Sequence, residues 1–197
     1  MSKIRRFSLA LLPALLFSGV ASATILQYSV TLDGPSESPA NASPGTGSGT
    51  VDYDDVAHSL TLNLTFSGLT GITTASHIHA ATLTAFTGTA GVATTTPTFA
   101  GFPLGVTSGA YSNILDLTLA SSYNPSYVTA NGGTTGTAEV ALAAAMAAGK
   151  AYWNVHSATF GGGEIRGFLT AVPVPAAVWL FGSALGLMGV MRRKISN

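Results

Sequence analysis

Histidine side chains are the groups in this sequence best suited to bind a metal ion, and the chain has four of them. His77 and His79 flank Ile78, and His156 ends a Tyr-Trp-Asn-Val-His segment at residues 152–156. Side chains two residues apart on a β-strand point to the same face, so the imidazoles of His77 and His79 would project together. Imidazole nitrogens bind both copper and zinc. The spacing therefore makes His77, His79 and His156 candidate ligands for Cu or Zn.

A metal-free polar network is the competing interpretation of the same residues. Polar and apolar side chains alternate on many strands, so a lone His-x-His pair is a weak signal of a metal site. Asn154 shares its predicted strand face with His156, and Glu164 and Arg166 stand two residues apart later in the chain. An amide, a carboxylate and a guanidinium can hydrogen-bond to imidazoles and form a structural network. We expect this network of Asn154, Glu164 and Arg166 with no cofactor bound, and a Cu or Zn site is the alternative.

The composition excludes several classes of function. The sequence has no cysteine, which rules out disulfides and thiol chemistry. Six of the eight Lys and Arg residues stand at the two ends, so residues 24–171 keep two basic against eight acidic residues, a net charge of −6. Nucleic-acid binding requires a basic surface, and no Gly-x-Ser-x-Gly motif marks a serine nucleophile. We therefore expect a non-catalytic domain that does not bind nucleic acid.

The first 23 residues have the pattern of a secretory signal peptide. Lys3, Arg5 and Arg6 precede an apolar run at residues 7–20, and an Ala-x-Ala site follows at residues 21–23. This order of a basic, an apolar and a small-residue segment is typical of exported proteins. We expect signal peptidase to remove residues 1–23 and the protein to be exported.

A second apolar segment lies near the other end of the sequence. Residues 176–191 carry no charge, and a cluster of three basic residues follows them at 192–194. Trp179 stands near the start of the segment, where an aromatic ring suits the membrane interface, and basic residues are retained on the cytoplasmic side. We expect residues 172–197 to form a tail with a transmembrane helix. An ordinary anchor that stays attached is the simpler interpretation of this tail.

The tail resembles the PEP-CTERM sorting signal in its Val-Pro-x-Pro-Ala form. The resemblance runs from Val172 to Lys194 and includes a Pro motif, one hydrophobic segment and a terminal basic cluster. It implies cleavage near the motif by an exosortase-type enzyme, in a Gram-negative host that makes exopolysaccharide. It also implies a location in the cell envelope, with membrane tethering before processing, or in the extracellular matrix. The motif consists of Val172, Pro173, Val174, Pro175 and Ala176.

The segment between the two ends is long enough for one domain and reads as β-structure. In residues 58–66 every second residue is Leu or Phe, which predicts a half-buried strand with Leu60, Leu62, Leu64 and Phe66 in the core. We expect an antiparallel, Greek-key-like sandwich or barrel with one short helix at residues 139–148. A turn at 159–163 should take positive φ at its three glycines. The strands are expected at 25–32, 49–53, 58–66, 75–84, 112–119, 151–158 and 163–171, with loops at 34–49 and 87–106.

Three ordered motifs in this domain resemble the CHRD domain, a family named from chordin. They are Ser-His-Ile-His at residues 76–79, Tyr-Trp-Asn-Val-His at 152–156 and Gly-Glu-Ile-Arg-Gly at 163–167. The resemblance covers about residues 26–170 and implies that His156, Glu164 and Arg166 gather near the His-x-His pair. It implies no reaction for bacterial members.

We therefore expect an exported, non-catalytic CHRD-domain protein of the envelope or matrix, processed by signal peptidase and an exosortase-type enzyme. Exopolysaccharide is a candidate partner. The alternative is a metal-binding protein that uses the His cluster.

Overall fold

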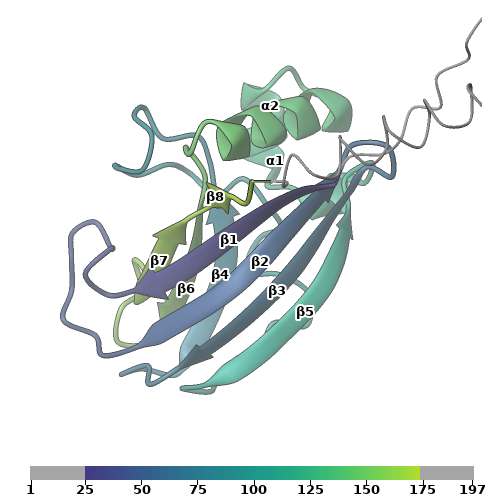
Figure 1. Cartoon of the computed structure of the whole chain (residues 1–197). Helices are drawn as coiled ribbons and strands as arrows, with labels where there is room; N and C mark the ends of the chain where they lie inside the picture. Colours follow the sequence, from purple (N-terminus) through teal and green to yellow (C-terminus); the bar gives the residue numbers. More distant parts are fainter. Residues whose placement is uncertain (1–24, 174–197) are drawn as a thin grey trace, which may run out of the picture.

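A computed structural model describes residues 25–173 of the chain (Figure 1). The expected signal peptide, most of the sorting motif and the expected C-terminal helix lie outside the described residues. Within residues 25–173, no helix is both long and apolar enough to cross a bilayer.

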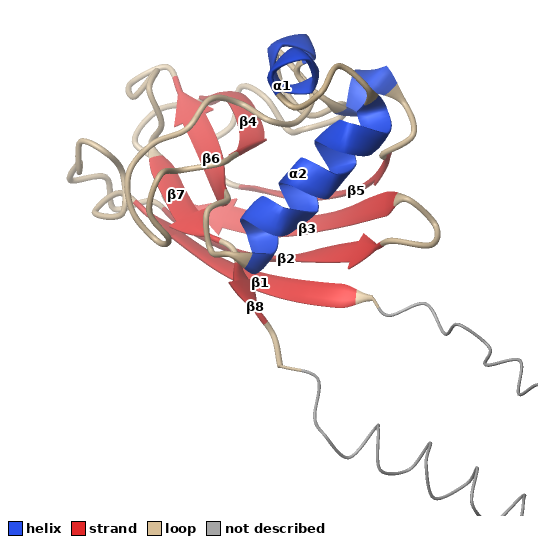
Figure 2. Ribbon diagram, turned by 90° about the horizontal axis from the view of Figure 1, so that it is seen from above, coloured by secondary structure: helices blue, strands red, loops and turns tan. Residues whose placement is uncertain are grey.

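The described chain forms one curled antiparallel sheet with two helices on one side of it (Figures 1 and 2). Its strand order is β4-β6-β7-β1-β2-β3-β5, and β8 pairs with β1. The prediction of a mainly antiparallel β fold is confirmed. The strands are β1 (Leu26–Asp33), β2 (Thr46–Asp54), β3 (Ser59–Ser67), β4 (Thr73–His79), β5 (Gly109–Asp116), β6 (Tyr152–Ser157), β7 (Ile165–Phe168) and β8 (Thr170–Ala171).

The core lies between the sheet and the helices, and strand alternation decides which residues enter it. Leu60, Leu62, Leu64 and Phe66 of β3 are all buried, as their spacing predicted. On β6, Trp153 is fully buried, and its indole N–H donates to a buried hydroxyl at 2.8 Å. Each buried side chain of this size contributes about 1.5–3 kcal/mol of hydrophobic stabilisation. The inward faces of these strands therefore hold the domain together without disulfides.

The helices differ from the prediction in number and in length. α2 (Thr135–Ala147) begins four residues before the predicted start at Glu139, because a capping box between Thr134 and Thr137 fixes its first turn. α1 (Pro125–Ala130) was not predicted. Its six residues are too few to show a helical period, although the Asn124 side chain caps it and Pro125 opens it. A short 3-10 turn, η1 (Ala120–Ser122), precedes it.

Several predicted boundaries were wrong. The loop predicted at 34–49 ends earlier, because β2 starts at Thr46 and continues through Gly47 and Gly49. A Cβ on Gly49 would lie 2.3 Å from the carbonyl oxygen of Asn63 on β3, so the glycine permits close strand contact and does not mark a loop. The strand predicted at 75–84 ends at His79. The closing strand divides into β7, which pairs with β6 and β1, and β8, which pairs with β1.

Candidate metal centre

The three candidate histidines meet on one face of two neighbouring strands. β4 and β6 pair antiparallel, with His77 opposite Asn154 and His79 opposite Tyr152. His156 follows Asn154 by two residues on β6, so it lies on the same face. The ring centroids of His77 and His156 are 5.2 Å apart, those of His77 and His79 5.8 Å, and those of His79 and His156 5.9 Å. Trp153 of β6 points to the opposite face of these strands and enters the core. The alternation of side chains along each strand therefore places the histidines on the face that points away from the core.

Backbone carbonyls fix the orientation of every ring. The contacting nitrogens are Nε2 of His77, Nδ1 of His79 and Nδ1 of His156, the last two at 3.0 Å from their carbonyl oxygens. A carbonyl oxygen only accepts, so each of these nitrogens must carry the ring proton in the neutral imidazole. The opposite nitrogen of each ring is therefore left with a lone pair. The carbonyls belong to Pro97, Ala90 and Gly161, in that order.

The three lone-pair nitrogens are buried, unpartnered and close together. His77 Nδ1, His79 Nε2 and His156 Nε2 are shielded from solvent and have no hydrogen-bond partner. One nitrogen from each ring lies within 4.8 Å of the other two. Three nitrogens at the usual bond length of about 2.0–2.1 Å from one metal would be roughly 3.5 Å apart, so shifts of about 1 Å would close the site. Unpartnered buried acceptors otherwise cost about 1–3 kcal/mol each.

Burial keeps the histidines neutral and ready to act as ligands. Desolvation lowers the pKa of His79 to about 4, although its contact with the Ala90 carbonyl acts in the opposite direction. Desolvation also lowers the pKa of His77 and that of His156. A metal ion and a proton compete for the same lone pair, so a ligand with a low pKa is available to a metal at neutral pH.

Two members of the predicted polar network lie beside the histidines. Asn154 stands between His77 and Arg166 in the strand register. The Arg166 guanidinium lies 4.8 Å from the centre of the Tyr152 ring, and that ring stacks on His79 at 4.8 Å with an interplanar angle of 7°. Arg166 donates to the carbonyl oxygens of Ser36 and Gly88.

Glu164 does not join Arg166 or the histidines, contrary to the prediction. It lies in a bend before β7, so strand alternation does not govern its direction. Its carboxylate accepts hydrogen bonds from the Ser43 hydroxyl at 2.6 Å, the Gly71 amide at 3.2 Å and the Thr70 amide. Burial raises the pKa of Glu164, but these hydrogen bonds and one from Ser157 outweigh it and leave the pKa lowered. Glu164 therefore joins three separate segments of the chain.

Glu37 takes the place beside Arg166 that was expected for Glu164. Its Oε2 is 3.9 Å from Arg166 Nε, while its Oε1 is buried without a hydrogen-bond partner. Burial raises the pKa of Glu37 to about 7, although the charge of Arg166 acts to lower it. Sequence reasoning missed this residue, because it stands in a loop rich in Pro, Ser and Gly that shows no periodic pattern.

The turn between β6 and β7 covers this part of the site. Of its three glycines only Gly163 has a positive φ, +134°, so the prediction for Gly161 and Gly162 was wrong. A Cβ on Gly163 would lie 2.5 Å from both Asn154 Nδ2 and Glu37 Oε1. The same turn supplies the Gly161 carbonyl that holds His156.

The fourth histidine serves a different part of the fold. His58 Nδ1 lies 3.0 Å from Glu139 Oε2, and the Tyr53 hydroxyl donates to the same carboxylate at 2.9 Å. Glu139 is a buried residue of α2, whereas Tyr53 lies on β2 and His58 in the turn after it. These contacts attach α2 to the sheet.

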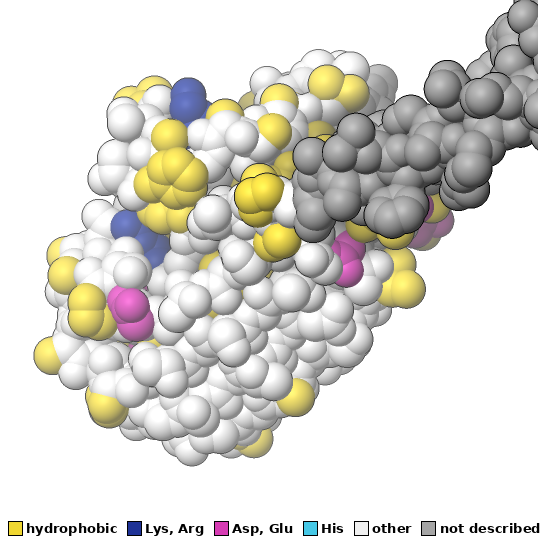
Figure 3. Space-filling model, viewed as in Figure 1, with side chains coloured by type: hydrophobic (Ala, Val, Ile, Leu, Met, Phe, Trp, Pro, Cys, Tyr) yellow, Lys and Arg dark blue, Asp and Glu magenta, His cyan; other side chains and the backbone are white. Residues whose placement is uncertain are grey.

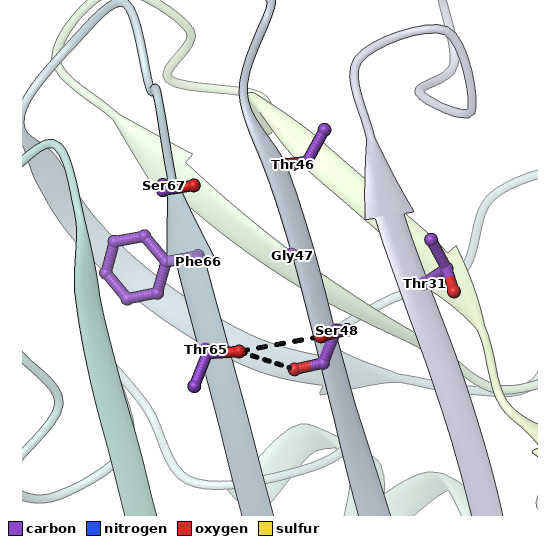
Figure 4. A pocket seen from close by; sticks show the side chains of 7 residues that line it. All are labelled: Thr31, Thr46, Gly47, Ser48, Thr65, Phe66 and Ser67. Carbon is purple, nitrogen blue, oxygen red and sulfur yellow. Dashed lines mark hydrogen bonds between the residues drawn. The ribbon is translucent and has the colours of Figure 1, made fainter.

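The outer face of β1, β2, β3 and β5 carries a second surface feature. Its exposed side chains are mostly hydroxyls and amides, and Figure 3 shows a broad uncharged surface over these strands. A hollow of about 370 Å³ lies among them (Figure 4). We call this the hydroxyl face; its central rows are Thr31, Ser48 and Thr65, and Ser29, Thr50, Asn63 and Ser112.

The fold and the site define a class: a cysteine-free, curled antiparallel β domain with two buried histidines and one half-buried histidine together on one face of its sheet. The sequence matches the family model of the CHRD domain over residues 28–169, and the chain belongs to the CHRD-domain family. The resemblance seen in the sequence motifs is therefore confirmed for this domain. No curated protein and no solved structure matches the chain.

Proposed function

We propose that this protein is an exported CHRD-domain module that binds a copper or zinc ion through His77, His79 and His156. Two observations carry the proposal: one nitrogen from each ring lies within 4.8 Å of the other two, and each ring has a buried nitrogen without a hydrogen-bond partner. The opposite nitrogen of each ring is held by a backbone carbonyl, the arrangement by which metal-binding histidines are usually oriented.

The arrangement fits a metal better than the metal-free network that the sequence favoured. A structural network keeps its value only when its buried polar groups are satisfied. Here each of the three rings leaves a buried nitrogen without a hydrogen-bond partner, and three acceptors cannot hydrogen-bond among themselves. Glu164, the carboxylate that the network would use to hydrogen-bond the histidines, contacts Ser43 instead. A bound cation would satisfy all three acceptors at once.

Metal analysis of the full-length protein tests the proposal. Protein purified without an affinity tag should take up one Cu or Zn ion per chain in a titration. The triple variant with His77, His79 and His156 each changed to Ala should lose that binding. His58→Ala is the matched control, because it removes a histidine outside the cluster. Uptake that persists in the folded triple variant would place the metal elsewhere.

Export and sorting through the two ends form the second part of the proposal. The basic, apolar and Ala-x-Ala segments at residues 1–23 support removal by signal peptidase. The tail at 172–197 supports membrane tethering, recognition by an exosortase-type enzyme and delivery to the envelope or matrix. The intact mass of the protein from native cells should then correspond to a mature chain that ends near residues 172–177. Mature protein that retains Trp179 and Arg192 would indicate an ordinary anchor.

Exopolysaccharide is the proposed partner outside the cell, and the hydroxyl face supports it. Hydroxyl and amide side chains in adjacent rows can exchange hydrogen bonds with the hydroxyl groups of a sugar chain without charge attraction. Electrophoresis through gels containing a neutral polysaccharide should retard the protein. Ala at both Thr50 and Asn63 should remove that retardation, whereas Thr129→Ala on α1 should not. If the parent, the double variant and Thr129→Ala each migrate equally fast with and without polysaccharide, this role is contradicted.

A further inference from the structure

We infer that the histidine cluster is built for monovalent copper in three-coordinate form, in preference to Zn²⁺ or Cu²⁺. The inference rests on the proposed metal-binding function and names the ion that the site selects. Three features carry it: the number of donors, their closure from solvent and the absence of a compensating negative charge among them.

The number of donors is the first feature. Among the residues that the structure describes, the group that can converge on one ion contains His77, His79 and His156 and no carboxylate. Zinc sites nearly always have four ligands, or three protein ligands and a water. Cu²⁺ favours square-planar or tetragonal coordination, which also needs at least four donors. Cu⁺, by contrast, forms stable complexes with three nitrogen ligands.

Closure of the site removes the usual source of a fourth ligand. Each of the three free ring nitrogens has less than 1 Å² of accessible surface, so a water molecule does not reach it from outside. The carbonyls of Ala90, Pro97 and Gly161 hold the other nitrogen of each ring, so a ring cannot turn its free nitrogen toward solvent without losing that contact. A zinc ion bound here would therefore lack the water that completes its coordination.

The charges around the site favour a monovalent ion. All three ligands would be neutral imidazoles, because each ring keeps its proton on the nitrogen at the carbonyl and binds the ion through the other nitrogen. The charged group beside them is cationic: Arg166 lies over Tyr152, which stacks on His79. The nearby Glu37 carboxylate is directed to Arg166. The cost of burying an ion rises with the square of its charge, so an uncompensated divalent ion costs about four times as much as a monovalent one.

Competition titrations of the full-length apoprotein test the inference. Cu⁺ is added without oxygen in competition with bicinchoninate, and Zn²⁺ and Cu²⁺ are added in competition with chelators of known affinity. We expect one Cu⁺ per chain, with a dissociation constant at least 100-fold below those for Zn²⁺ and Cu²⁺. X-ray absorption should show Cu⁺ with three nitrogen neighbours. His79→Ala should weaken Cu⁺ binding at least 100-fold, and His58→Ala should leave it unchanged, with circular dichroism confirming that both variants fold.

The outcomes separate the inference from the proposed function. Tighter binding of Zn²⁺ or Cu²⁺ at the same histidines, or a four-coordinate copper spectrum, would overturn the preference for Cu⁺ and leave the metal site standing. No uptake of any of the three ions would overturn both. Equal Cu⁺ affinity in the parent and in folded His79→Ala protein would remove the cluster as the copper site.

Discussion

Gly163 is the position where a single methyl group should do most damage to the site. Its φ of +134° lies in a region that residues with a Cβ rarely adopt. A Cβ there would also lie 2.5 Å from Asn154 Nδ2 and 2.5 Å from Glu37 Oε1, and both side chains are buried. Gly163→Ala therefore combines backbone strain with an overlap that no flexible surface group can relieve.

The expected loss of stability follows from these two effects. Backbone strain in this region costs about 1–3 kcal/mol. Forcing a methyl group into a packed site costs about 1–3 kcal/mol more. Gly163→Ala should therefore lower the free energy of unfolding by roughly 2–6 kcal/mol. Gly161 and Gly162 lie two residues or fewer away, but neither has a positive φ nor any atom within 4 Å of its added Cβ.

Urea unfolding of the three single Gly→Ala variants provides the comparison. Gly161→Ala and Gly162→Ala should change stability by no more than about 0.5–1 kcal/mol, and a small gain is possible because alanine restricts the unfolded chain. Gly163→Ala should stand apart from both. Three equal midpoints, or a larger loss at Gly161 or Gly162, would refute the assignment of strain to Gly163.

The other predictions concern buried polar groups and a helix end. Glu164→Gln should cost about 2–4 kcal/mol in urea unfolding, because an amide NH₂ would face the donors that its carboxylate now satisfies. The pKa of Glu37 is raised from 4.5 to about 7 in the folded state, so the folded protein binds this proton more tightly than the unfolded chain does. As pH rises from 4.5 to about 7, the parent should therefore lose up to about 3 kcal/mol of unfolding free energy relative to Glu37→Gln. Unfolding midpoints at pH 5 and pH 8 measure this, and a constant difference between the two proteins contradicts it. Tyr53→Phe should cost about 1 kcal/mol by removing one donor to Glu139. Thr134→Ala should cost about 1 kcal/mol and reduce the helical circular dichroism of α2.

Strand alternation made much of the sheet predictable. Leu60, Leu62 and Leu64 identify β3 and its buried face. When one side of a sheet is packed, an apolar residue at every second position must point to that side, because a shift of one residue would expose them all. The same rule placed His77 and His79 together. It failed at Glu164, since a residue in the bend before β7 is not bound by the alternation of the strand.

The parts of the site that come from loops could not be predicted. The Ala90 and Pro97 carbonyls that orient two of the rings belong to backbone, which any residue type supplies, so the sequence carries no mark of them. Glu37 reaches Arg166 from a loop about 130 residues away along the chain. Such contacts depend on the positions that the folded sheet gives to these loops, and the local propensities of the residues do not predict those positions. α1 was missed because six residues are too few to show a period of 3.6.

The pairing of β8 with β1 determines how this domain would carry a mechanical load. Ala171 lies opposite Tyr28, and the Val172 amide donates to the Gln27 carbonyl at 2.8 Å, so the chain enters and leaves the domain side by side. Force that separates these two points opens the short β1–β8 ladder one bond at a time, as a zipper opens, and does not shear it. β7 continues along the same edge of β1, where Arg166 lies opposite Asp33, and β6 and β4 lie beyond β7. A domain pulled by its ends would therefore peel at β8 first and at β7 next, before the force reaches the strands that carry the histidines.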